Sequence, residues 1–154
     1  MTPEQKLQRL GLELPPAPKP VGSYVPAVRA GSLIFTAGQI PTKDGRLISA
    51  GKVPTEVSLE DAQAAARQAV LNALAAVMAE AGTLEAIARV VRMNVFVNSA
   101  PGFTDQAKVA NGASDLLVEI FGDAGRHTRC AVGAAELPLN APVELDLILA
   151  LSQT

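Results

Sequence analysis

One long alanine-rich segment, residues 59–81, sets the architecture available to this chain. Its apolar side chains recur at the spacing that places them on one face of a helix. Ser58 before it and Gly82 after it are residue types that begin and end helices, and Asp61 stands in the first turn. Because many of the apolar positions are alanines, we expect this helix to lie close against a sheet.

Strand patterns flank this helix on both sides. Residues 88–99 alternate in polarity, which predicts a strand with Val91, Met93, Val95 and Val97 on one side. The other predicted elements are strands at 24–29 and 32–37, a turn at Asp44–Gly45, a second helix at 103–122 and two strands within 126–151. The order is therefore β-β-loop-α-β-α-β-β.

Two helices can cover only one face of such a sheet. In the last strand, one side is uniformly apolar and faces the helices, while the other side carries Glu144 and Asp146. In the preceding strand, Arg129 and Ala131 share one side. We expect Arg129 and Glu144 to meet on the uncovered face, at or near an interface with another copy of the chain, and alternation then places Cys130 on the helix-covered side.

The N-terminal 20 residues differ from the rest of the chain. Residues 3–11 predict a short amphipathic helix, and LPPAPKP after it reads as an extended connector. Residues 21–154 have the length of one domain. The N-terminus lacks the basic-then-apolar order of a signal peptide, and apolar runs are too short to span a membrane, so a cytoplasmic protein is expected.

Charge and composition exclude several classes of partner and cofactor. The formal net charge is −2, which provides no electrostatic footprint for nucleic acid or an anionic membrane. Cys130 is the only cysteine and His127 the only histidine, so neither a disulfide nor a multi-ligand zinc site is expected. We predict no cofactor and no metal.

Three segments resemble the reactive intermediate deaminase (Rid, or YjgF-like) family. They are GSYVPAVRAGSLIFTAGQIP, VVRMNVFVNS and RCAVGAAELPLNAPVELDLIL, in order across residues 21–151. The specific part is R-x-x-V-x-x-A-x-L-P followed by a glutamate six residues after the proline. This resemblance implies a chorismate-mutase-like α+β fold, with a mixed sheet and two helices on one face, in a homotrimer with sites in the clefts between subunits.

The resemblance also implies roles for individual residues. Arg129 would hold a substrate carboxylate, Glu144 would handle the attacking water, and Tyr24 would line the pocket. The substrate-binding positions would also include Gly38, Ala37 and Ala131. The family's imine-hydrolysing members usually carry a serine where this chain has Ala37 and a cysteine where it has Ala131.

Each candidate also has a structural interpretation. Arg129 offers a planar fork that matches a carboxylate, or it forms an ion pair with Glu144 or Asp146 across an interface. Glu144 is either a general base or the partner in that pair.

Tyr24 contributes a hydroxyl to the site or packs at the edge of the domain, and Gly38 admits a ligand or marks a bulge. For the lone histidine we expect a surface or interface role, and the Asn111–Gly112 pair indicates a kink near the cleft or close packing.

These residues predict a cofactor-free hydrolytic deaminase that converts reactive 2-imino or enamine acids into 2-oxo acids and ammonia. The partners expected are other copies of the chain and a small carboxylate-bearing substrate. An alternative is a non-catalytic trimer that binds or senses a small carboxylate. Endoribonuclease or translation-inhibitor activity is disfavoured by the acidic balance and the low aromatic content.

Overall fold

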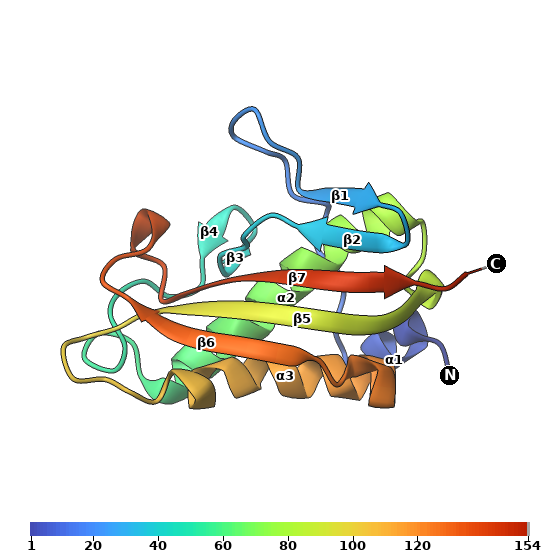
Figure 1. The fold of residues 1–154 in the computed structure, drawn as a ribbon. Coiled ribbons are helices and arrows are strands. Elements are labelled where there is room, and N and C mark those ends of the chain that lie inside the picture. The colour runs from blue at the N-terminus through green and yellow to red at the C-terminus, as the bar shows by residue number, and fades with distance from the viewer. Residues whose placement is uncertain (154) are drawn as a thin grey trace.

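The computed structural model describes residues 1–153 as a five-stranded mixed sheet with two long helices on one face (Figure 1). The strands in spatial order are β1 (Ala27–Ala30), β2 (Leu33–Thr36), β7 (Val143–Leu151), β5 (Ile87–Asn98) and β6 (Thr128–Ala134). Only β5 and β6 pair in parallel; the other neighbours are antiparallel. The predicted element order is thus correct.

Helix α2 (Leu59–Ala81) is the segment that the alanine pattern predicted. The Ser58 hydroxyl accepts a hydrogen bond from the Asp61 N–H at 3.1 Å, and Gly82 follows the last turn. Helix α3 (Gln106–Phe121) lies beside α2 on the same face of the sheet (Figure 1). Both helices bury an apolar face against the sheet, and one side of β7 is buried beneath them along its whole length.

Gly112 explains how closely the two helices pack. A Cβ at this position would collide with the backbone carbonyl of Gln63 in α2. A glycine inside a helix costs about 1 kcal/mol relative to alanine. The close contact with Gln63 explains why a glycine nevertheless stands at this position. Close packing, one of the two interpretations of the Asn111–Gly112 pair, is therefore correct for Gly112.

We expect Gly112→Ala to lower the free energy of unfolding by about 1–3 kcal/mol, because the obstacle is backbone that cannot rotate away. Urea denaturation would measure it, with Ala107→Gly at an exposed position of α3 as the control for helix propensity alone. A stabilised Gly112→Ala protein would contradict the close approach.

The N-terminal segment is attached to the domain. Helix α1 (Pro3–Arg9) buries Leu7, and the Glu4 carboxylate accepts hydrogen bonds from the Thr83 hydroxyl at 2.8 Å and the Leu84 N–H at 2.7 Å. The two donor residues are the N-cap and the first residue of the 3₁₀ turn η1 (Leu84–Ala86). The remaining short elements are β3 (Thr42–Lys43), β4 (Arg46–Leu47), η2 (Gly122–Gly125) and η3 (Pro138–Asn140).

The alternation predicted for β5 is interrupted near its start. A register shift between Val90 and Arg92 puts Val90 in the core and leaves Val91 only partly buried. Beyond the shift, Met93, Val95 and Val97 are buried as predicted. A bulge adds one residue to one strand of a pair and so reverses the sides that the preceding residues face.

Within residues 1–153, the other face of the sheet carries no helix (Figure 1). Its exposed apolar side chains are Val28, Phe35, Phe96 and Val132, each at least 37% exposed. Among residues 1–153, no helix is both long and apolar enough to cross a bilayer.

Candidate active site

Arg129 lies on the helix-covered face of the sheet, which corrects the prediction that it shares the open face with Glu144. In the parallel β5–β6 ladder, Arg129 is the partner of Met93, and Met93 is fully buried beneath the helices. Ala131, paired with Val95, packs against the same core. Small and polar residues occupy both sides of β6, so its sequence pattern did not reveal which side is covered.

The Arg129 guanidinium is held by two neutral side chains of α3. Its Nη1 donates to Asn111 Oδ1 at 2.8 Å and to Ser114 Oγ at 3.1 Å. Within residues 1–153, none of the ion pairs includes Arg129. Within one chain Arg129 therefore pairs with neither Glu144 nor Asp146, and an ion pair across an interface stays a prediction. Its Nε and Nη2 donate no hydrogen bond within residues 1–153.

His127 belongs to the same cluster. Its Nδ1 lies 2.6 Å from the Gly125 carbonyl oxygen and its Nε2 lies 2.9 Å from Ser114 Oγ. Burial lowers the pKa of His127 and the Arg129 charge lowers it further, against the opposing effect of the Gly125 carbonyl. The imidazole therefore favours its neutral form. These contacts were not apparent from the sequence, because nothing in the linear order links residue 114 to residue 127.

The two residues of the Asn111–Gly112 pair face different neighbours. Gly112 faces α2, while Asn111 binds the guanidinium of Arg129. Close packing therefore holds for Gly112, whereas a kink near the cleft stays a prediction.

Glu144 lies on the open face, where β2 bulges beside β7. Phe35 pairs with Ile148, and Gln39 pairs with Leu145 through hydrogen bonds of 2.7 and 3.0 Å. Three residues of the β2 segment therefore oppose two of β7, which is a bulge. The Thr36 hydroxyl accepts from the Leu147 N–H at 2.9 Å and satisfies the backbone there.

Gly38 makes room for the Glu144 side chain. A Cβ on Gly38 would lie 2.5 Å from Glu144 Oε1 and 3.1 Å from its carboxyl carbon. The glycine thus occupies a bulge, as one interpretation predicted, and that bulge lets the backbone approach the carboxylate. Ala37, the preceding residue, donates its N–H to the Pro26 carbonyl at 2.8 Å.

Partial burial raises the pKa of Glu144, and the nearby charge of Asp146 raises it further. Asp146 itself accepts a hydrogen bond from Asn94 Nδ2 at 2.9 Å, and Arg92 Nε donates to Asn94 Oδ1 at 3.0 Å. A carboxylate with a raised pKa is a stronger base once it ionises, which suits a group that removes a proton from water.

Tyr24 and Cys130 occupy exposed positions. Tyr24 lies in the loop before β1 and is 51% exposed. Cys130, the partner of Asn94 in the β5–β6 ladder, is exposed on the open face. The prediction of a small core thiol on the helix-covered side is therefore wrong, for the same reason as for Arg129.

One chain does not bring all of the predicted site residues together. Arg129 stands on the covered side of β6, at one edge of the sheet, while Glu144 and Gly38 stand on the open side near β2. Among residues 1–153, no three His, Cys, Asp or Glu side chains cluster as metal ligands would.

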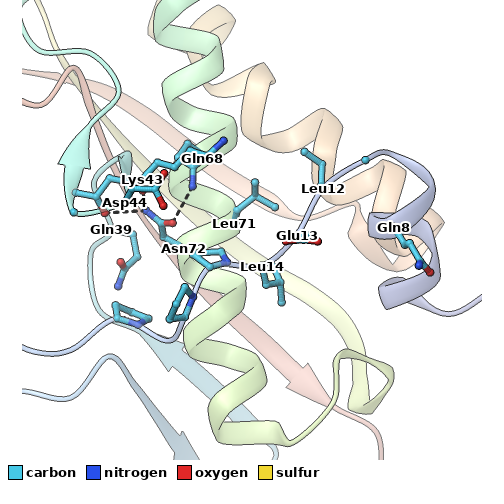
Figure 2. A pocket seen from close by; sticks show the side chains of 16 residues that line it. Gln8, Leu12, Glu13, Leu14, Gln39, Lys43, Asp44, Gln68, Leu71 and Asn72 are labelled. Atoms are coloured by element: carbon cyan, nitrogen blue, oxygen red, sulfur yellow. Dashed lines mark hydrogen bonds between the residues drawn. The ribbon is translucent and has the colours of Figure 1, made fainter.

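A cavity of about 710 Å³ lies elsewhere, between the N-terminal segment, the β3–β4 turn and α2 (Figure 2). Its wall includes Asn72, whose amide nitrogen donates to the carbonyls of Ile40 and Thr42 at 3.0 Å and whose Oδ1 accepts from Gln68 at 3.1 Å. Because these internal bonds occupy the Asn72 amide, the residue serves to hold the loop after β2. Arg129, Glu144 and Tyr24 are not among the lining residues.

Comparisons with known proteins identify the fold and the family. The family described as "YjgF/chorismate_mutase-like, putative endoribonuclease" matches residues 4–151. Protein TCP17 of Trypanosoma cruzi is 45% identical over 147 residues, which cover 95% of this chain and 92% of that protein. The 2-iminobutanoate/2-iminopropanoate deaminase of Dermatophagoides farinae is 31% identical over 138 residues, which cover 90% and 93%.

Solved structures agree with this assignment. The protein Atu1372 of Agrobacterium tumefaciens has a TM-score of 0.90 at 41% identity, covering 97% of this chain and 92% of that one. The structure of Escherichia coli TdcF with bound serine has a TM-score of 0.66 at 28% identity, covering 88% and 94%. The fold is thus the predicted α+β chorismate-mutase-like fold, and the chain belongs to the YjgF-like family of reactive intermediate deaminases.

Proposed function

We propose that this protein is a cofactor-free deaminase that hydrolyses reactive 2-imino acids and their enamine forms. The observation that carries the proposal is the Arg129 guanidinium, which neutral side chains hold and which has no acidic partner among residues 1–153. A partly buried positive charge without a counter-ion favours an anion, and the free fork fits a carboxylate.

The reaction needs little beyond orientation and one activated water. With the carboxylate on Arg129, the imine carbon is held for attack, and Glu144 takes the proton from the attacking water. The carbinolamine that forms then expels ammonia. The C=N bond is replaced by C=O, so one water is consumed and a 2-oxo acid and ammonia are released.

Glu144 would come from a neighbouring copy, because Arg129 and Glu144 occupy opposite faces of one sheet. We propose a homotrimer in which the open face is covered, with Gly38 and Tyr24 on the Glu144 side of the cleft and Ala131 on the Arg129 side. The exposed apolar side chains of that face, such as Phe35 and Phe96, support such a contact.

The trimer makes a prediction about Cys130, the single thiol of the chain. In the assembly its reaction with a disulfide reagent should be slow, and in denaturant it should be fast. Sedimentation would give the mass in parallel. A stable monomer at micromolar concentration, with a rapidly reacting thiol, would rule out the trimer.

The names of two relatives support the substrate class. One is called a 2-iminobutanoate/2-iminopropanoate deaminase, and the TdcF structure contains serine, a small molecule with a carboxylate. The endoribonuclease in the family description finds less support in this chain, whose net charge is −2. We place the reaction in the cytoplasm.

A second candidate is a carboxylate-binding trimer without catalysis. It is favoured by Ala37 and Ala131, which have no polar groups to assist a reaction. Following the decay of enzymatically generated 2-aminoacrylate with and without the protein separates the two candidates. Acceleration supports the deaminase; binding of 2-oxobutanoate without acceleration supports the sensor.

A further inference from the structure

We propose that Ser114 and His127 are positioning residues that orient the Arg129 guanidinium through a one-directional chain of hydrogen bonds. This inference rests on the proposed function, because it concerns how the same carboxylate site is held in shape. Both residues act through Arg129, and neither is assigned a contact with the substrate.

The direction of the chain follows from its one unambiguous acceptor. The Gly125 carbonyl can only accept, so His127 Nδ1 carries the hydrogen in the 2.6 Å contact. In the neutral ring Nε2 is then an acceptor, and the Ser114 hydroxyl donates to it at 2.9 Å. The lone pairs of Ser114 Oγ remain for Arg129 Nη1, which donates at 3.1 Å.

The carbonyl that starts the chain is itself held in place. Gly125 is buried, and a Cβ there would collide with the backbone carbonyl of Leu117 in α3. The turn η2 therefore sits directly on α3, the helix that also carries Ser114 and Asn111. Both ends of this series of hydrogen bonds, the Gly125 carbonyl and the Arg129 guanidinium, are thus held against α3. This limits how far the guanidinium can turn.

Neutral partners are what a carboxylate site requires. An acid beside Arg129 would orient it equally well but would compete with the substrate for its charge. Asn111 and Ser114 each accept one Nη1 hydrogen bond and leave the positive charge uncompensated. The fork therefore stays both oriented and attractive to an anion.

This series of hydrogen bonds requires a neutral His127 imidazole. A proton on Nε2 would replace the acceptor of the Ser114 hydroxyl with a donor and would bring a second positive charge toward Arg129. Charged residues on the neighbouring segments include Arg126, whose Nε lies 3.5 Å from Asp123 Oδ1 in η2, and Arg89 of β5, which donates to the Arg126 carbonyl at 3.0 Å. Since burial and Arg129 both lower the pKa of His127, the chain is intact at neutral pH and is lost as the pH falls through that pKa.

Nuclear magnetic resonance can test this directly, since His127 is the only histidine and gives one imidazole signal. We expect its pKa to lie below that of a free histidine, to rise in Arg129→Ala, and to rise on addition of 2-oxobutanoate in the parent but not in Arg129→Ala. A ring that titrates as a free histidine and ignores both changes would overturn the proposal.

Binding of 2-oxobutanoate, measured by calorimetry, provides a second readout. We expect Ser114→Ala and His127→Phe to weaken binding about 5- to 10-fold, the effect of one lost hydrogen bond. His127→Gln should recover part of the loss, because its amide oxygen can accept from Ser114. In the Arg129→Ala background, Ser114→Ala should have no further effect. Ser99→Ala removes a similarly half-buried hydroxyl just after the end of β5 and should bind as the parent does.

The outcomes separate this inference from the proposed function. If Arg129→Ala abolishes binding while folded Ser114→Ala and His127→Phe bind normally, the positioning role is wrong and the carboxylate site stands. If Arg129→Ala itself binds normally, the proposed function is wrong. Should Ser114→Ala fail to fold, the histidine variants and the titration still decide.

Discussion

Arg129→Ala is expected to reduce kcat/KM for a 2-imino acid by roughly 100-fold or more, because it removes a charge-assisted bidentate contact with the carboxylate. Its present partners, Asn111 and Ser114, are neutral, so losing the arginine leaves no unpaired charge behind. The proposed trimer should therefore persist. Steady-state kinetics on 2-aminoacrylate, with mass measured on the same sample, checks both parts.

Arg129→Lys is the matched variant. An ammonium keeps the charge but cannot present the planar fork, so we expect it to recover little of the lost activity. If Arg129→Lys worked at the parent rate, the site would need only a positive charge and not the oriented fork. If Arg129→Ala lost activity only in proportion to lost trimer, the arginine would be structural.

Glu144→Gln should leave 2-oxobutanoate binding near the parent value and lower kcat by roughly 100-fold or more, because the amide keeps the shape beside Gly38 but cannot take a proton. The pH dependence gives a second check. As the proposed general base, Glu144 must be ionised to act, and burial raises its pKa. On acidification, activity should therefore begin to fall at a higher pH than it would with an ordinary glutamate.

Asp146→Asn is the control for this second prediction. Burial is the main cause of the raised pKa of Glu144, and the charge of Asp146 is the second; this substitution removes that charge. The new amide can still accept a hydrogen bond from Asn94. The acid limb of the activity profile should therefore move to lower pH with kcat largely retained. Parent-rate turnover by Glu144→Gln in intact trimers would require the catalytic role to be withdrawn.

The sequence determined the elements and most of the architecture. The Ser58 and Gly82 signals located α2, and strict alternation in β7 correctly assigned its buried and open sides, because burial on one face imposes a period of two. The motif around Arg129, Pro138 and Glu144 indicated the family, and the comparisons confirmed it.

Only the tertiary structure decided which side of the edge strand β6 is covered by the helices. The residues of β6 are small or polar on both sides, so only the parallel register with β5 and the packing of α3 show that Arg129 faces the helices and Cys130 the open face. The contact between Ser114 and His127 was equally beyond the sequence. Such contacts join segments distant in the chain, and the geometry that creates them exists only once helix and sheet have packed.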